Sequence, residues 1–317
     1  MVLTSIYEAI KKSKNIAIFT HVRADGDCLG AGVAMFYALK NMGKENIGLY
    51  NAEPIHKNYK FFTLDIVQNS MSFKPDLMIA LDCGKLTRLG YFEPEFKKHD
   101  NTINIDHHIS NEMFATLNFV QDKASSTCEI LYNFFTQFNI AIDKNIANAL
   151  FCGLSADTGC FMHSNTTKNV HYIASKLMEY DLDIEQINYH LFKTKTKKQI
   201  TLTAHALSNL QYFHGGKVAI CGLDRKTYKL INANDEDDPR LADMISGIEG
   251  VKIGICYNQN IDGGYNISFR TSCADVDVNL VAQTYGGGGH KKAAGCKIYA
   301  SKQKMIQSLV ENSGRFI

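Results

Sequence analysis

Three short strand-like runs in the first half of the chain end at or next to an aspartate or a histidine. They are residues 15–20, which precede His21, residues 76–82 and residues 102–106. Short apolar runs of this kind are typical of strands that are buried on both faces of a sheet. Helical patterns separate these runs, and strands that alternate with helices favour a parallel sheet covered by helices on both sides.

The intervening helices have recognisable end signals. Residues 27–42 predict a helix that Gly43 ends, because glycine adopts the left-handed backbone that closes many helices. Residues 126–129, Ser-Thr-Cys-Glu, match a capping box and predict a helix that reaches about residue 138. Residues 144–154 predict a further helix.

The second half of the chain has its own strand signals. They return after Gly215 and Gly216, at residues 217–222, 251–257, 265–270 and 295–299, and helical stretches alternate with them. A chain of 317 residues is long for one hydrophobic core. We therefore expect an α/β protein with an N-terminal parallel-sheet domain over residues 1–165 and a smaller C-terminal α/β domain over residues 212–317. Residues 166–211, which show no strand signal, are expected to form a helical connector.

The composition limits the expected location and partners. The net charge of +2 provides no global field that attracts nucleic acid, so anion binding has to come from local patches. The chain has nine cysteines and no Cys-x-x-Cys pair, and its first residues have neither the charged start nor the apolar core of a signal peptide. We expect reduced thiols, a cytoplasmic location and no membrane association.

Acidic and imidazole side chains gather at the ends of the predicted strands. A single aspartate there is most often a helix cap or turn residue, and a single histidine is most often a surface residue. Several together are unfavourable without cations, because each uncompensated buried carboxylate costs on the order of several kcal/mol. In an open parallel sheet, ligands collect at the carboxyl ends of the strands. The candidates are His21, Asp25, Asp27, Asp82, Asp106, His107, His108 and Asp157.

This set of side chains suits two hard divalent metal ions. Carboxylates and imidazoles without thiolates favour Mn²⁺ over structural Zn²⁺, with Mg²⁺ or Co²⁺ as alternatives. Paired divalent metals most often serve hydrolytic chemistry on phosphates. We therefore expect a cofactor of two divalent ions, Mn²⁺ by preference.

A glycine-rich motif lies near the C-terminus. Residues 286–289 are glycines, and His290, Lys291 and Lys292 follow them. Backbone N–H groups of consecutive glycines can approach an anion closely, although flexible turns have the same composition. The basic run at residues 193–198 favours a solvated helix start over an RNA-binding patch.

Together these motifs resemble those of the DHH phosphoesterases that carry a DHH-associated C-terminal domain, and within them the nanoRNase/pAp phosphatases. The motifs are His21-x-x-x-Asp25-Gly-Asp27-x-x-Gly30, Asp82 with Arg88-Leu-Gly90, Asp106-His107-His108, Gly153-Leu-Ser-Ala-Asp157-Thr-Gly159, and residues 286–289 with His290. The resemblance covers essentially the whole chain, and none of the proposed ligands is missing.

The resemblance implies two metal positions with one shared ligand. His21 and Asp25 would hold one ion, and Asp82 would bridge it to the second. The remaining ligands of the second ion would be Asp27, His107 and Asp157.

The resemblance also implies catalytic and substrate-binding roles. Besides Asp82, the catalytic residues would be Asp106, which orients a ligand histidine, and His108, which faces the substrate phosphate or donates a hydrogen bond behind the site. Arg88 would touch phosphate or support a loop. The substrate-binding residues implied are Arg88, Arg270, Ser272, Gly287, Gly288, Gly289, His290 and Lys291.

The activity that the resemblance implies is a Mn²⁺-dependent phosphoesterase. It would degrade short oligoribonucleotides to 5′-mononucleotides and remove the 3′-phosphate from 3′-phosphoadenosine 5′-phosphate (pAp) to give AMP. Two alternatives stay open: a phosphodiesterase for cyclic dinucleotides or linear pApA, and a nucleotide sensor without turnover. Short RNA and pAp are the expected partners; no protein partner is evident, and a homodimer is compatible with the sequence.

Overall fold

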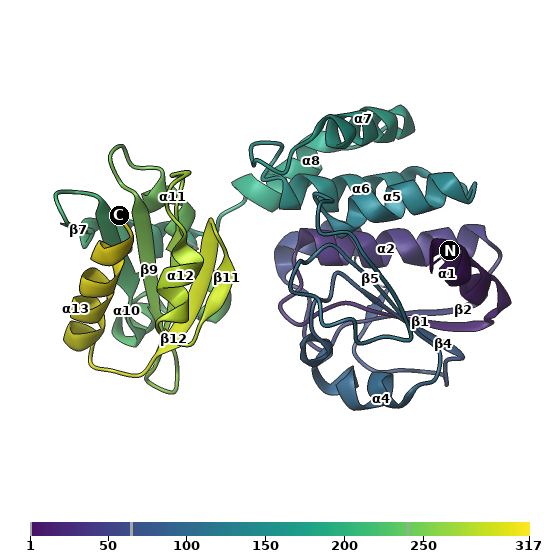
Figure 1. The fold of residues 1–317 in the computed structure, drawn as a ribbon, viewed down its shortest axis with the longest axis horizontal. Coiled ribbons are helices and arrows are strands. Elements are labelled where there is room, and N and C mark those ends of the chain that lie inside the picture. Colours follow the sequence, from purple (N-terminus) through teal and green to yellow (C-terminus); the bar gives the residue numbers. More distant parts are fainter. Residues whose placement is uncertain (1, 64–65, 240) are drawn as a thin grey trace. The chain divides into compact units, whose positions relative to one another are not determined.

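The computed structural model describes residues 2–63, 66–239 and 241–317, which form two compact units that divide between Thr194 and Lys195 (Figure 1). Each unit contains one six-stranded sheet with helices packed against it. The expected α/β class, with a parallel sheet in the N-terminal unit and a second sheet in the C-terminal unit, is confirmed.

All strands of the N-terminal sheet are parallel, in the order β3-β2-β1-β4-β5-β6. They are β1 (Asn15–Phe19), β2 (Asn46–Tyr50), β3 (Val67–Gln68), β4 (Leu77–Leu81), β5 (Thr102–Asp106) and β6 (Leu117–Val120). The chain leaves β1 toward β2 on one side, and β4 later pairs with β1 on the other. Such a reversal of strand order opens a crevice at the carboxyl ends of the two central strands, where α/β proteins bind ligands.

Helices cover both faces of this sheet because its strands are apolar on both faces. Ile16 and Ile18 of β1 belong to a core with α1 (Val2–Lys12), α2 (Gly26–Asn41), α5 (Thr127–Gln137) and α6 (Lys144–Asp157). Ala17 and Phe19 point to the opposite core, which includes Phe96 of α4 (Glu93–Lys98). Figure 1 shows α2, α5 and α6 on one side of the sheet and α4 on the other.

Glycines allow α2 and α6 to approach closely. A Cβ atom on Gly30 of α2 would lie 2.5 Å from the carbonyl oxygen of Ala149 in α6, and one on Gly153 of α6 would lie 2.6 Å from Oδ1 of Asp27. Neither position has room for a side chain. The close crossing places the first turn of α2, which carries Asp27, beside the last turn of α6, which ends at Asp157.

Residues 166–211, predicted to be a connector, are mostly helical between residues 168 and 208, with breaks at residues 181–183 and 194–196. They contain α7 (Lys168–Leu177), a 3₁₀ turn (Met178–Tyr180), α8 (Ile184–Asn188), a π-helical turn (Tyr189–Lys193) and α9 (Lys197–Ser208). The division between the units falls within this segment. Leu202 and Ala206 of α9 pack into the C-terminal unit. The boundaries at residues 165 and 212 stay a prediction.

The C-terminal sheet is mixed, in the order β11-β12-β10-β9-β8-β7. Its strands are β7 (Gln211–Phe213), β8 (Val218–Leu223), β9 (Ile253–Gln259), β10 (Tyr265–Arg270), β11 (Gly288–His290) and β12 (Ala293–Ile298). Only the β8–β9 pair is parallel among these described strands. Three short helices accompany them: α10 (Arg225–Ile231), α11 (Ala242–Ser246) and α12 (Val278–Gln283); α13 (Lys302–Ser313) follows β12. The glycine motif, whose composition is also that of flexible turns, contributes the edge strand β11.

The close crossing of α2 and α6 leads to a stability prediction. Gly30→Ala should destabilise the chain by about 1–3 kcal/mol, because the added methyl group overlaps the backbone of α6. Gly247→Ala is the matched control, since its Cβ would meet nothing closer than 3.5 Å. Urea unfolding followed by far-UV circular dichroism measures both. Equal midpoints for the two variants would contradict the tight crossing.

Candidate metal centre

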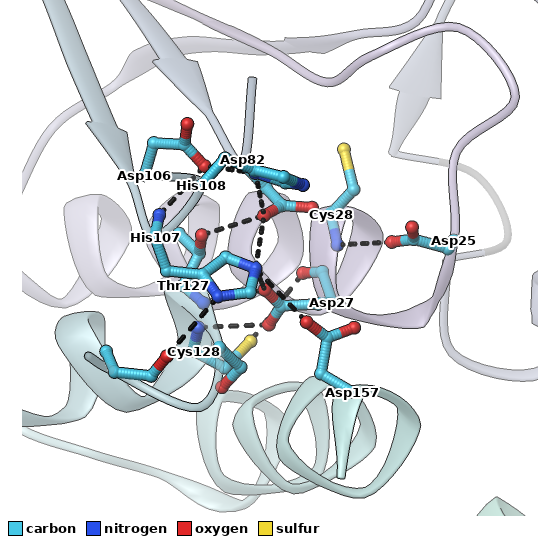
Figure 2. A network of polar contacts seen from close by, with 12 residues as sticks. Asp25, Asp27, Cys28, Asp82, Asp106, His107, His108, Thr127, Cys128 and Asp157 are labelled. Atoms are coloured by element: carbon cyan, nitrogen blue, oxygen red, sulfur yellow. Dashed lines mark hydrogen bonds and ion pairs between the residues drawn. The ribbon is translucent and has the colours of Figure 1, made fainter. Parts of the chain in front are cut away.

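Eight predicted site residues come together at the carboxyl edge of the N-terminal sheet, as Figure 2 shows for those it labels. Each is delivered by the end of an element. His21 follows β1, Asp82 follows β4, and Asp106 ends β5. The others are Asp25 and Asp27 at the start of α2, His107 and His108 after β5, and Asp157 at the end of α6.

His21 and two aspartates form the first group of side chains. The Nε2 atom of His21 lies 3.4 Å from Oδ2 of Asp82 and 3.7 Å from Oδ2 of Asp25. The other oxygen of Asp25 accepts a hydrogen bond from the backbone N–H of Cys28 at 3.1 Å, so Asp25 also caps α2. Cys28, whose sulfur lies near His21 and Asp82, was missed from the sequence. Burial raises the pKa of its thiol, which makes a thiolate ligand unfavourable.

His107 and three aspartates form the second group. The Nε2 atom of His107 lies 3.1 Å from Oδ2 of Asp157, 3.5 Å from Oδ1 of Asp82 and 4.0 Å from Oδ2 of Asp27. Adjacent ligands of an octahedral ion with bonds of about 2.1 Å are about 3 Å apart, so these spacings suit one divalent cation. Asp82 belongs to both groups, because its Oδ2 faces His21 and its Oδ1 faces His107.

The clustered carboxylates of the second group would be stabilised by a cation. Burial and the charge of Asp82 raise the pKa of Asp27 to about 7, and burial and the charge of Asp27 raise the pKa of Asp157 to about 6. Burial also raises the pKa of Asp82. Burial acts to lower the pKa of His107, but its hydrogen bond to Asp157 and the charges of Asp27 and Asp82 raise that pKa to about 10. Without a metal ion, protons therefore compensate the clustered carboxylates.

Asp106 contacts the ring of His108. Its Oδ1 accepts hydrogen bonds from Nδ1 of His108 at 2.7 Å and from the backbone N–H of His107 at 2.8 Å, and its Oδ2 accepts one from Asn111 at 2.5 Å. Burial acts to raise the pKa of Asp106, but the hydrogen bond from His108 and the charge of His108 lower it. Asp106 is therefore an ionised acceptor. Nδ1 of His108 must then carry a proton. Asp106 was expected to orient a ligand histidine. The ring that it contacts is that of His108, the histidine expected to face the substrate.

Arg88 lies against His21. Its guanidinium group is 2.8 Å from Nδ1 of His21, and its backbone carbonyl accepts a hydrogen bond from Val22 at 2.8 Å. These contacts connect the loop after β4 to the segment after β1. Arg88 was expected either to touch phosphate or to support a loop. These contacts are those of a residue that supports the loop.

The N-terminus of α5 holds Asp27 in place. The backbone N–H groups of Thr127 and Cys128 donate to Oδ2 and Oδ1 of Asp27 at 2.6 Å and 3.0 Å. Helix N-termini stabilise negative charge in this way. The sequence predicted the helix from its capping box but not these bonds, because the two partners are about a hundred residues apart.

Asn165 connects the loop before α5 to the end of α6. Its amide group donates to the carbonyl oxygens of Ser125 and Asp157, each at 3.1 Å. The buried carboxylate of Glu129 in turn accepts hydrogen bonds from the backbone N–H and the hydroxyl of Ser125. This network holds the backbone of Asp157 in place.

The predicted substrate-binding residues of the C-terminal unit lie on neighbouring strands. Arg270 of β10 and His290 of β11 both stand opposite Ala293 of β12, so their side chains emerge on the same side of the sheet. The guanidinium group of Arg270 also donates to Asp243 at 2.9 Å.

The other predicted residues of this unit surround that row. Ser272 follows β10, and its hydroxyl donates to the carbonyl oxygen of Ser246 at 3.3 Å. Gly288 and Gly289 are part of β11, and Gly287 precedes it. Lys291 follows β11, and its carbonyl oxygen accepts a hydrogen bond from Val278.

Comparison with protein families identifies both units. Residues 15–154 match the model of the DHH family, N-terminal domain, and residues 224–313 match that of the DHHA1 domain. The chain belongs to the DHH family. As a DHH phosphoesterase it is a hydrolytic enzyme, so the family and the enzyme class expected from the motifs are confirmed.

Relatives of this DHH protein match it over nearly its whole length. The probable bifunctional oligoribonuclease and PAP phosphatase NrnA of Streptococcus mutans is 27% identical, over 96% of this chain and 97% of the relative. The bifunctional oligoribonuclease and PAP phosphatase NrnA of Mycoplasma genitalium is 28% identical, over 95% and 94%. The crystal structure of an exopolyphosphatase-related protein from Bacteroides fragilis shares the fold, with a TM-score of 0.91 and 20% identity over 99% of this chain and 96% of that one.

None of the helices in the described part of this DHH chain combines the length and the apolar character needed to cross a bilayer.

The protonated state of the metal-free cluster leads to a pH prediction. A divalent ion has to displace protons from Asp27, Asp157 and His107, whose pKa values are raised to about 7, 6 and 10. Affinity for Mn²⁺ should therefore rise with pH by about tenfold per pH unit for each proton displaced, most steeply below about 6 and more gently between about 7 and 10, where only His107 still has a proton to lose. Isothermal titration calorimetry in buffers of different protonation enthalpy measures both the affinity and the protons released. Binding that is independent of pH and releases no proton would contradict this account.

Proposed function

We propose that this chain is a Mn²⁺-dependent phosphoesterase with two metal ions, which degrades short oligoribonucleotides to 5′-mononucleotides and converts pAp to AMP. The observation that carries the proposal is the position of Asp82. Its two oxygens face two different histidines, each with further carboxylates close by. The similarity to relatives named bifunctional oligoribonuclease and PAP phosphatase, over nearly the full length of both chains, supports the choice of substrates.

The proposed ligand sets follow these two groups. His21 and Asp25 would hold the first ion, Asp82 would be shared by both ions, and the second ion would be held by the other members of the second group, Asp27, His107 and Asp157. Oxygen and imidazole donors without a thiolate fit Mn²⁺. When bound, two divalent ions activate water for attack on phosphorus and stabilise the charge that develops on the leaving oxygen.

His108 is the residue proposed to act on the substrate. Its Nδ1–H is engaged by Asp106, so the ring is held in one orientation. Burial acts to lower the pKa of His108, but the hydrogen bond to Asp106 and the charge of Asp82 raise it. The imidazolium form of His108 is therefore favoured. A protonated His108 can donate from Nε2 to a phosphate oxygen, which compensates negative charge during the reaction.

The C-terminal unit is proposed to bind the nucleotide. Arg270 and His290 lie on one side of the sheet and offer donors for a phosphate group, and β11 presents glycine backbone next to them. One such grip explains both activities, because the phosphorus attacked is attached to the 3′ oxygen of the gripped nucleotide in an oligonucleotide and in pAp alike. With a net charge of only +2, additional nucleotides gain little electrostatic binding, which favours short substrates.

The proposed location is the cytoplasm. All nine cysteines are free thiols. Seven of the nine are protected in the fold, either because they are at least nine-tenths buried or because they lie in a β-strand. Reduced thiols are the usual state of cysteine in that compartment.

A comparison of substrates tests the proposal. With Mn²⁺, the chain should hydrolyse pAp and a diribonucleotide with kcat/KM at least about tenfold above that for a 24-mer RNA. Asp82→Ala should lower kcat on every substrate by about 10³-fold or more, because it removes the only ligand shared by both ions. Products are separated by liquid chromatography. Preferred cleavage of cyclic di-AMP or pApA would favour the alternative phosphodiesterase, and tight binding without turnover would favour a nucleotide sensor.

A second test concerns the grip of the C-terminal unit. Arg270→Ala should raise KM about 10- to 100-fold on the diribonucleotide and on pAp, because a charge-assisted hydrogen bond to phosphate is lost. Bis-p-nitrophenyl phosphate, which has no nucleoside to grip, should be affected much less.

Arg225→Ala is the matched control for this variant. Arg225 is another arginine of the C-terminal unit that pairs with an aspartate, Asp235, and it has no proposed substrate role. The measured quantity is the ratio of kcat/KM on the diribonucleotide to that on the mimic. An unchanged ratio in Arg270→Ala would contradict the shared grip.

A further inference from the structure

Thr127, the first residue of α5, is hydrogen-bonded to carboxylates from two other elements. Its backbone N–H donates to Oδ2 of Asp27 at 2.6 Å, and its hydroxyl donates to Oδ1 of Asp82 at 2.9 Å. Asp27 lies in the first turn of α2, whereas Asp82 follows β4. Figure 2 shows Thr127 beside these two side chains. A single residue of α5 therefore sets the spacing of two proposed metal ligands.

The hydroxyl of Thr127 is not needed to begin the helix. Ser126 is the N-cap, and its hydroxyl accepts the hydrogen bond from the backbone N–H of Glu129 at 3.0 Å. A β-branched residue in the first turn offers no advantage in helix propensity. Thr127 is fully buried, and a buried hydroxyl without a partner would cost about 1–3 kcal/mol. Its hydrogen bond to Asp82 provides the partner that the buried hydroxyl needs. Since the helix does not need this hydroxyl, its effect is on the Asp82 carboxylate.

The bond fixes the rotation of the Asp82 carboxylate. The terminal torsion of an aspartate is broad, so a carboxylate without a directional partner samples many orientations. Thr127 engages Oδ1, the oxygen that faces His107, and this leaves Oδ2 facing His21. The backbone of Asp82 itself is left-handed, with φ of 57°, a conformation that costs about 1–2 kcal/mol for residues other than glycine. Both features hold the carboxylate between the two groups.

We propose that Thr127 is a positioning residue for the second metal ion. Its hydroxyl orients Asp82 and its backbone N–H orients Asp27, so that the oxygens of both point toward His107 and Asp157. This inference rests on the proposed function, since it concerns how the proposed dimetal site is held. It adds a residue that touches no metal ion and no substrate, and that acts only through two carboxylates.

Thr127→Val tests the proposal, because valine has the same shape and keeps the backbone N–H but lacks the hydroxyl. Binding of Mn²⁺ to the full chain is measured by isothermal titration calorimetry and by native mass spectrometry. The affinity for the second ion, which faces the oxygen that loses its partner, should fall about 10- to 100-fold, the usual effect of removing such a supporting bond, while the affinity for the first ion falls less. Thr127→Ser, which retains the hydroxyl, should restore the second affinity to within about threefold of wild type.

Activity provides an independent measurement. For Thr127→Val, the Mn²⁺ concentration that gives half-maximal hydrolysis of pAp should increase by the same factor as the second dissociation constant. A merely structural role would lower activity at every Mn²⁺ concentration and would not be rescued by serine. Thr127→Ala, which also lacks the hydroxyl and is smaller, replaces the valine variant if far-UV circular dichroism shows that valine disrupts folding.

The outcomes separate this inference from the proposed function. Wild type that binds two ions and hydrolyses pAp, together with variants lacking the hydroxyl that bind the second ion unchanged, overturns the role of Thr127 alone. A wild-type chain that binds fewer than two Mn²⁺ ions or does not hydrolyse pAp overturns the proposed function, and this inference with it.

Discussion

Three aspartates whose charges repel one another, Asp27, Asp82 and Asp157, converge on His107 in the N-terminal unit. Two of them are almost completely buried, and burial raises the pKa of all three. Such a cluster persists only if protons, hydrogen-bond donors or cations compensate it. Much of the surrounding architecture can be understood as the means by which the fold holds these carboxylates together.

The fold supplies this compensation from the ends of its elements. The strand order reverses next to β1, so the segments after β1 and β4 both reach the same crevice. The close crossing of α2 and α6, which Gly30 and Gly153 permit, brings two of the carboxylates together. The N-terminus of α5 then provides donors to the side chain of Asp27, and Asn165 fixes the backbone of Asp157. Each contribution is local, but the site exists only where all of them meet.

Much of the fold and of the candidate metal centre could be predicted from the sequence, because apolar strands that end in acids or imidazoles have a strong local signature. His21, Asp82 and Asp106 are all found at strand ends, where the pattern placed them. Strands β3 and β6 escaped notice because they are two and four residues long and not fully buried. The residues that hold the proposed ligands in position were less visible. Thr127 was considered only as part of a capping box, and its bond to Asp82 depends on packing between distant segments.

The C-terminal glycines show the same limit. Their composition suggested a loop, because glycine favours turns, yet three residues of the motif pair with β12 as an edge strand. The deciding factor is a close approach between strands. A Cβ atom on Gly287 would lie 2.2 Å from the carbonyl oxygen of Gly295, which glycine alone avoids. A run of glycines indicates that the backbone has no room for side chains, but it does not indicate which neighbouring segment lies so close.

The bonds between α5 and Asp27 join parts of the chain that are about a hundred residues apart. Contacts of such long sequence separation carry a loop-closure entropy cost, and chains rich in them fold more slowly. The site is therefore complete only when these distant segments have come together, and ions held by the proposed ligands would bind the folded N-terminal unit. Ligands that bind the native state alone raise its stability by mass action. If the proposed ions bind here, they would add to the stability of this unit, and their removal would leave it more easily unfolded and more open to proteolysis.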